Sequence, residues 1–229
     1  MERLSTINGF REMNTLYATI GSGNCFKPFL VMNQLGIPFR VALVDVLKGE
    51  TRLPAYLAVN PNGTVPYLTL PDGRGIGESN AMLWYLAEGS HLIPTDPYGR
   101  AKVLQWMFFE QSALEPFISP ARFFISIVPS RRLEREKDIA VWQERGRKGL
   151  KLLDDHLRGR RFVVDDTYSI ADVSLFGYTH LAAEGGFDFD EFPAVAAWIG
   201  NVERTEGFVP LSALSAAPRL RTGVETKAA

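Results

Sequence analysis

The chain has 229 residues, of which 46% are apolar, so it is long and apolar enough to build one large domain or two small ones. Its 25 Lys and Arg residues balance 26 Asp and Glu residues, and this near-neutral charge excludes the basic surface that nucleic acids and acidic membranes attract. The single cysteine, Cys25, excludes an internal disulfide and a multi-cysteine metal site, and the scattered His91, His156 and His180 add no metal-ligand spacing.

The first ninety residues alternate strand and helix patterns. Short β-prone runs flank an apolar run at helical spacing, which predicts a βαβ unit with strands over 15–20 and 39–46 and a helix over 26–35. The connector over 48–62 contains Pro54 and Pro61 and is expected to hold at most one irregular helix. Asp72-Gly73 between two short apolar runs, 66–70 and 75–77, then predicts a hairpin, and a helix follows over 80–88.

A break in the pattern falls at 91–99, where Pro94 and Pro97 bracket a polar stretch. We therefore expect a first domain over 14–90, a linker over 91–99 and an all-helical domain over 100–214. Its helices are predicted over 100–114, 131–157, 170–183 and 193–205. The segments 1–13 and 215–229 are expected to be flexible termini.

The pair Val65-Pro66 opens the first strand of the hairpin. Proline cannot donate to a β-ladder, so it must lie at a strand start or edge. A cis bond before Pro66 would turn the chain sharply and leave the Val65 N–H and C=O facing outward. An extended peptide ligand could then pair with this backbone.

A helix start in the second half is also well marked. In Tyr168-Ser169-Ile170-Ala171-Asp172, the Ser169 hydroxyl can cap the helix while the Asp172 carboxylate reaches back to the Ser169 N–H. We expect this capping box to be structural, because the helix that it starts is strongly apolar.

These motifs, in this order and spacing, resemble the cytosolic glutathione transferases. The resemblance covers roughly residues 14–210 and rests on Asn-Pro-Asn-Gly-Thr-Val-Pro-Tyr-Leu at 60–68, Glu78-Ser79, and Ser169-Ile-Ala-Asp172. It implies an α/β domain of thioredoxin-like fold (β-α-β-connector-β-β-α) followed by an all-α helical bundle. It also implies glutathione as a substrate, no metal, and a homodimer.

Glutathione is an extended tripeptide with two carboxylates, an ammonium and a thiol. The resemblance assigns its backbone pairing to Val65 beside Pro66. The Ser79 hydroxyl and the helix N-terminus behind it suit the γ-glutamyl carboxylate, with Glu78 near the ammonium. The structural alternative is that Ser79 only caps the helix and Glu78 only favours its first turn.

Further contacts are expected from the connector. Lys48, Thr51 or Arg52 could meet the glycyl carboxylate, and Asn62 lies just before the turn into Val65. The alternative is that Lys48 and Arg52 are solvated loop charges.

The chemistry depends on the first strand-to-helix turn, Gly21-Ser22-Gly23-Asn24-Cys25. A hydroxyl hydrogen bond and the helix field would both favour a thiolate there, against a free thiol pKa of about 8.5. Ser22 matches the catalytic serine of similar theta and zeta class enzymes, and Asn24 fits a related bacterial pattern. Cys25 is the rival, as a nucleophile that forms mixed disulfides. Tyr17 is a second rival, although a tyrosine packed in the strand core explains it better.

The sequence thus predicts a glutathione transferase that adds the glutathione thiolate to a small hydrophobic electrophile or a peroxide. Two alternatives stay open: a glutathione-dependent disulfide-bond oxidoreductase, and a non-catalytic binding or regulatory module of the same fold. We expect a cytoplasmic protein with neither nucleic acid nor membrane as partner, since the chain shows no signal peptide and no apolar run that could span a bilayer.

Overall fold

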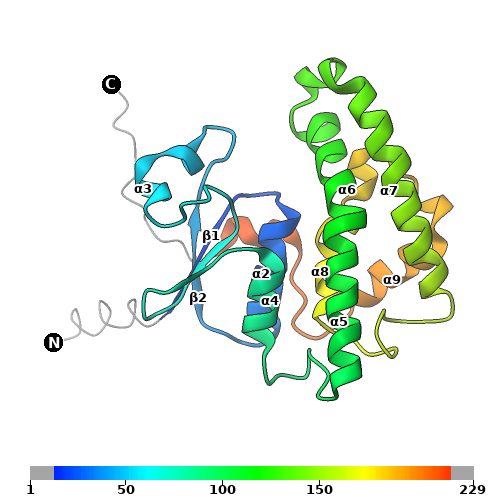
Figure 1. Ribbon diagram of the computed structural model, residues 1–229, viewed down its shortest axis with the longest axis horizontal. Helices are drawn as coiled ribbons and strands as arrows, with labels where there is room; N and C mark the ends of the chain where they lie inside the picture. Colours follow the sequence, from blue (N-terminus) through cyan, green and yellow to red (C-terminus); the bar gives the residue numbers. More distant parts are fainter. Residues whose placement is uncertain (1–12, 218–229) are drawn as a thin grey trace. The chain divides into compact units, whose positions relative to one another are not determined.

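A computed structural model describes residues 13–217 of the chain (Figure 1). Within this range the chain divides into two compact units, residues 13–86 with 209–217 and residues 87–208. The ends expected to be flexible lie outside the described residues, apart from Met13 and residues 215–217. None of the described helices is both long and apolar enough to cross a lipid bilayer.

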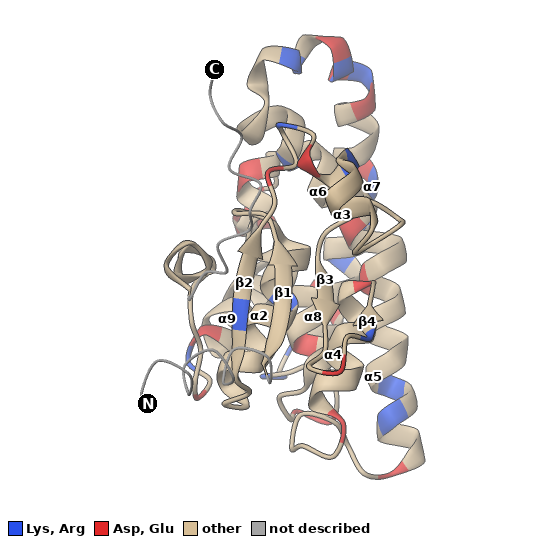
Figure 2. Ribbon diagram, turned by 90° about the vertical axis from the view of Figure 1, so that its left-hand side faces the viewer, with Lys and Arg blue, Asp and Glu red and all other residues tan. Residues whose placement is uncertain are grey.

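The first unit is built on a four-stranded sheet in the order β2-β1-β3-β4, whose strands lie side by side in Figure 2. Its strands are β1 (Asn14–Ala18), β2 (Phe39–Leu43), β3 (Tyr67–Thr69) and β4 (Gly75–Ile76). β1 pairs with β2 in parallel and with β3 in antiparallel orientation, and β3 pairs with β4 in antiparallel orientation. The parallel pair needs a crossover, which α2 (Gly23–Gln34) supplies. This is the predicted thioredoxin-like order.

The connector between β2 and β3 holds two helical pieces, where the sequence predicted at most one. They are the 3-10 turn η1 (Glu50–Arg52) and the short helix α3 (Pro54–Leu57). Gly49 adopts a left-handed conformation (φ 75°) before η1, and Pro54 occupies the first turn of α3. Glycine and proline can begin a helical element as well as end one. The sequence pattern took them only as breaks and therefore predicted too few helical pieces. The helix α4 (Ser79–Ala87) then follows the hairpin.

The C-terminal part of the described chain belongs to the first unit. The 3-10 helix η8 (Leu211–Ala216) contacts α2, and Leu214 is fully buried. This segment was predicted to close the helical domain at residue 214, with a flexible end from residue 215. The structure instead groups 209–217 with the first unit, because η8 packs against α2 and buries Leu214.

The second unit is helical throughout its main elements. These are α5 (Pro97–Phe109), η2 (Glu110–Leu114), α6 (Glu115–Arg122), η3 (Phe123–Ile127), η4 (Pro129–Arg131), η5 (Leu133–Arg135), α7 (Glu136–Leu157), α8 (Ile170–Thr179), η6 (Ala182–Gly185), η7 (Phe189–Glu191) and α9 (Pro193–Glu203). All ten residues of α8 are buried, so this helix forms the centre of the unit. The segment 115–127, for which no helix was predicted, is the main addition to the expected pattern.

The capping box at the start of α8 is present. Ser169 Oγ accepts from the Ala171 N–H at 3.3 Å, and Asp172 Oδ2 accepts from the Ser169 N–H at 3.0 Å. Asp172 Oδ1 also accepts from Trp198 Nε1 at 2.9 Å and from the Val163 N–H at 3.1 Å. This one carboxylate therefore ties α8 to α9 and to the loop before it, and its role is structural as predicted.

Candidate functional site

The first strand-to-helix turn ends in a serine that caps α2. Ser22 has an extended backbone (φ −84°, ψ 122°), and its Oγ accepts from the Cys25 N–H at 3.2 Å. A hydroxyl carries one proton besides its acceptor positions, so Ser22 can donate while it caps the helix, and in the protein alone it donates toward the Cys25 thiol. The turn is possible because Gly21 takes a left-handed φ of 80°. A half-buried hydroxyl donor thus lies at the positive end of α2.

Cys25 lies in a different environment from the one that a reactive thiol needs. Its side chain is fully buried, and the Thr19 N–H donates to its Sγ at 3.4 Å. Burial raises the pKa of Cys25 to about 11, although hydrogen bonds from Ser22 and Thr19 act in the opposite direction. The thiol is therefore neutral near pH 7. Burial of the thiol therefore weighs against the nucleophile role considered for Cys25.

The Val65–Pro66 peptide bond is cis, in the arrangement that the sequence analysis expected. Val65 is half-buried, and no described residue forms a hydrogen bond with its backbone N–H or C=O. The β1–β3 register, continued by two residues past Tyr17↔Tyr67, would bring Thr19 opposite Val65. The Thr19 N–H instead donates to Cys25 Sγ. The backbone of Val65 therefore remains open for an extended partner.

Ser79 brings the starts of two helices together. It is the first residue of α4 and is 5% exposed, and its Oγ donates to Oδ1 of Asn24 at 3.3 Å. Asn24 is the second residue of α2. The positive ends of α2 and α4 therefore lie at one place, which is a favourable position for an anion.

The position of Ser79 bears on the alternative that this residue only caps the helix. Ser79 lies inside α4, whose first backbone bond runs from the Met82 N–H to the Glu78 C=O at 3.0 Å. The residue before the helix is thus Glu78, which is exposed and has a left-handed φ of 60°. A non-glycine residue in this region is uncommon and is often found at functional sites.

The connector residues divide into exposed and buried ones. Lys48 forms an exposed ion pair with Asp45 at 3.2 Å, and Thr51 is 5% exposed. Arg52 Nη1 donates to the Asn62 C=O at 3.4 Å, across a turn in which Gly63 has a φ of 64°. The structure thus places Arg52 and Asn62 together, whereas Thr51 is a packing residue and Lys48 extends into solvent.

Tyr17 is a packed strand residue. Its ring meets the ring of Tyr56 edge to face at a centroid distance of 5.8 Å, and burial raises the pKa of its hydroxyl. Tyr56 and Asn60 are two polar residues that the sequence analysis did not single out. Both donate to the carbonyl of Thr64, immediately before Val65. Asn60 belongs to the segment 60–68 on which the family resemblance rests, and this was the one sequence signal that pointed to it.

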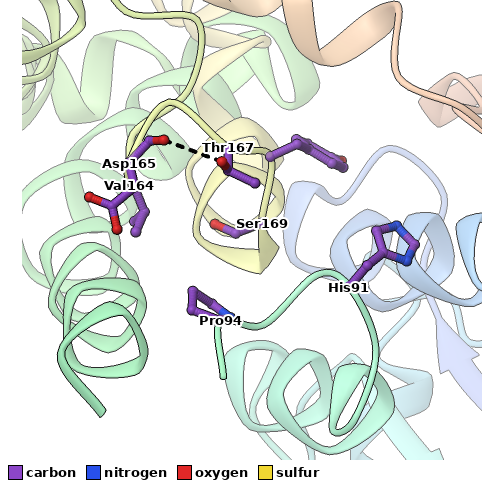
Figure 3. A pocket seen from close by; sticks show the side chains of 7 residues that line it. His91, Pro94, Val164, Asp165, Thr167 and Ser169 are labelled. Carbon is purple, nitrogen blue, oxygen red and sulfur yellow. Dashed lines mark hydrogen bonds between the residues drawn. The ribbon is translucent and has the colours of Figure 1, made fainter. Parts of the chain in front are cut away.

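The helical unit has a small hollow of its own, drawn in Figure 3, of about 150 Å³. Its lining includes His91, Pro94, Asp165 and Ser169. Sites for small organic ligands usually enclose about 300 Å³ or more, so this hollow is too small for a tripeptide. Among the described residues, no group of three or more His, Cys, Asp or Glu side chains is arranged to hold a metal ion.

The fold and the site define a protein whose thioredoxin-like unit presents two helix starts and an open backbone edge, followed by a helical unit. The chain belongs to the glutathione S-transferase family. Models of the glutathione S-transferase N-terminal domain and C-terminal domain match residues 21–88 and 130–201.

Similar proteins include glutathione S-transferase 2 of Schizosaccharomyces pombe, which is 30% identical over 215 residues (80% of this chain and 88% of that protein). A glutathione S-transferase structure from Pseudomonas fluorescens is 42% identical with a TM-score of 0.84, and the match covers 87% of this chain and 98% of that one. A family member from the same organism with two glutathione molecules bound is 24% identical, with a TM-score of 0.79 and coverage of 91% and 95%.

Proposed function

We propose that this protein is a glutathione transferase that binds glutathione on its first unit and stabilises the thiolate through the hydroxyl of Ser22. Val65 pairs with the cysteinyl backbone, and Ser79 with the start of α4 receives the γ-glutamyl carboxylate. Glu78 faces the ammonium, while Arg52 with Asn62 lies toward the glycyl end.

One observation carries this proposal. The bond of 3.3 Å between Ser79 Oγ and Asn24 Oδ1 holds the N-termini of α2 and α4 at one place. Glutathione has a carboxylate at its γ-glutamyl end and develops a second negative charge at its thiol. Two helix starts held together suit both charges, because each favours an anion by about 0.3–1 kcal/mol or more.

The reaction follows from these positions. The thiol of glutathione loses its proton to solvent, and the Ser22 hydroxyl donates to the resulting thiolate. The sulfur then forms a bond to the electrophilic carbon while the leaving group departs with its electron pair. With an organic hydroperoxide, the thiolate sulfur attacks the terminal oxygen and the O–O bond breaks, which gives a sulfenic acid and an alkoxide that takes a proton from solvent to become the alcohol. A second glutathione converts the sulfenic acid to the disulfide and water.

Steady-state kinetics with an aryl halide and glutathione test the role of Ser22. Ser22→Ala removes a hydrogen bond to a charged group, which is worth about 1.5–3 kcal/mol, so kcat should fall about 10- to 100-fold while KM for glutathione changes little. Cys25→Ala is the matched variant one helical turn away and should retain most of the activity. The reverse ranking would assign the chemistry to the thiol of Cys25.

A glutathione-dependent disulfide-bond oxidoreductase is the second candidate. The spacing of Ser22 and Asn24 in the sequence favours it. Turnover of a glutathione mixed disulfide faster than any aryl halide, organic peroxide or haloacid would select this function. A non-catalytic module would show no turnover of any of them, and failure to bind immobilised glutathione would favour it further.

We also propose that the protein acts as a homodimer. The exposed face of α5 carries three large apolar side chains, Tyr98 (70% exposed), Leu104 and Phe108 (69% exposed). A contact with a second copy of the chain would remove this apolar area from water. Sedimentation at the mass of a single chain would contradict the dimer.

A further inference from the structure

A buried pair of side chains holds the peptide unit next to the open backbone of Val65. Tyr56 Oη donates to the Thr64 C=O at 2.6 Å, and Asn60 Nδ2 donates to the same oxygen at 2.8 Å. Tyr56 is 7% exposed and Asn60 is 4% exposed. One carbonyl thus receives two side-chain donors, each held in a buried position.

The two donors are fixed by separate contacts. The Tyr56 ring packs edge to face on the ring of Tyr17 in β1, at an interplanar angle of 67°. The Asn60 carboxamide is oriented from its other end, since Oδ1 accepts from the Asn62 N–H at 3.2 Å. The donors therefore come from α3 and from the turn after it, and they converge on Thr64.

The consequence follows from peptide geometry. The C=O of Thr64 and the N–H of Val65 belong to one planar peptide unit, and in the trans form they point in opposite directions. Only the Val65–Pro66 bond is cis among the described residues, so the Thr64–Val65 unit is trans. Fixing the carbonyl toward Tyr56 and Asn60 therefore fixes the Val65 N–H on the opposite side. Donors on the carbonyl also polarise the unit and strengthen the bond that its N–H donates.

We propose that Tyr56 and Asn60 are positioning residues that set the affinity for glutathione by orienting the peptide unit between Thr64 and Val65. This inference rests on the proposed function, because the tripeptide backbone is the partner of Val65. Neither residue touches the thiol, so they act on binding of the tripeptide and not on its ionisation.

Calorimetric titration with glutathione tests the inference on Tyr56→Phe, Asn60→Ala and the double variant. Either donor alone still orients the carbonyl, so each single variant should weaken binding about threefold, and the double variant should lose more than the product of the two. The kcat at saturating glutathione, the KM for the electrophile and the pH dependence of kcat should stay as in the wild type. A general structural defect would also change kcat and the KM for the electrophile, and not the glutathione affinity alone.

Tyr67→Phe is the matched control, since the Tyr67 hydroxyl lies against Gly75 and forms none of the hydrogen bonds to the Thr64 carbonyl. It removes a tyrosine hydroxyl from the same unit, in β3 instead of α3, and should bind glutathione as the wild type does. Unchanged affinity in the double variant, with binding by the wild type intact, would overturn this inference alone. Absence of glutathione binding in the wild type would overturn the proposed function together with it.

Amide exchange at Val65 in protein saturated with glutathione decides the matter if the double variant does not fold. There the tripeptide bonds the Val65 N–H, so each single variant should exchange this amide faster than the wild type and leave Leu83, in the core of the same unit, unchanged. Equal exchange at Val65 in the glutathione complexes of both single variants and the wild type would overturn the inference.

Discussion

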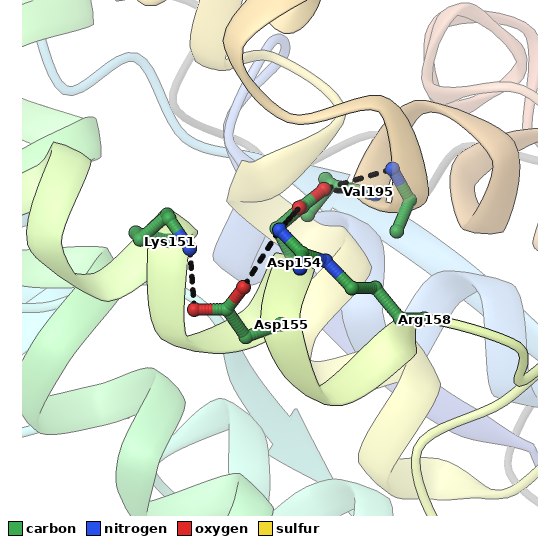
Figure 4. Close-up of polar contacts among 6 residues, drawn as sticks. Lys151, Asp154, Asp155, Arg158 and Val195 are labelled. Carbon is green, nitrogen blue, oxygen red and sulfur yellow. Dashed lines mark hydrogen bonds and ion pairs between the residues drawn. The ribbon is translucent and has the colours of Figure 1, made fainter.

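The start of α9 offers a sharp test of how the helical unit is held together. Phe192 precedes this helix and provides no side-chain cap. Asp154 of α7 takes that role, because its Oδ1 accepts from the N–H groups of Ala194 at 2.8 Å and Val195 at 3.2 Å (Figure 4). The carboxylate is 2% exposed, so these bonds are shielded from water.

Asp154→Ala should therefore destabilise the protein substantially. A helix cap contributes about 0.5–2 kcal/mol and a hydrogen bond to a charged group about 1.5–3 kcal/mol, so losing two such bonds should cost about 3 kcal/mol. For a protein of this size that lowers Tm by about 6–12 °C. Asp154→Asn keeps an acceptor oxygen but loses the charge, and its shift should be intermediate.

Calorimetric melting and amide exchange at Ala194 and Val195 measure the effect. Asp155→Ala is the control, because Asp155 is the next residue, is 45% exposed and pairs only with the side chains of Lys151 and Arg158 in the described chain. Its melting shift should be much smaller, as for most surface ion pairs. Equal shifts for Asp154→Ala and Asp155→Ala would refute the view that α7 caps α9.

Two further predictions concern buried acids and thiols. Cys25, with a pKa raised by burial to about 11, should resist alkylation by iodoacetamide near neutral pH until urea unfolds the protein; rapid labelling of the native protein would contradict this. Burial raises the pKa of Asp172 to about 6 from 3.8, so the folded state binds its proton more tightly than the unfolded state. The stability gained from that proton is complete below pH 3.8 and is lost as the pH rises to about 6, a change of about 3 kcal/mol. Urea unfolding across this window should show that slope in the wild type and lose it in Asp172→Asn; identical slopes would contradict the assignment.

The local geometry around several candidate site residues could be predicted from sequence because its signals are local. Val65-Pro66 and Ser22 each lie at a turn whose chemistry depends on neighbouring residues, and Ser79 follows the hairpin at fixed spacing. The role of Asn24 beside Ser79 could not be found in this way. Their contact joins residues 55 positions apart, and only the packing of α2 and α4 creates it.

The errors have physical causes as well. No bounds were predicted for the helix α6, which contains Pro116 and Pro120; prolines remove backbone donors and usually end a helix. Here Pro116 occupies the first turn, and the backbone ladder is interrupted by π-helical segments on either side of α6. The choice between Ser22 and Cys25 was left open for another reason: sequence shows the place of Cys25 at a helix start, whereas its burial is a property of the fold.

The ultraviolet absorbance of the bound thiolate, titrated against pH in the wild type and in Ser22→Ala, tests the central claim most directly. We predict that glutathione bound to the wild type ionises below the pKa of about 8.5 of a free thiol, and that Ser22→Ala raises this value by about one unit or more without a comparable loss of affinity. Identical titrations of the two proteins, or a bound thiol that ionises no more readily than a free one, would contradict the account.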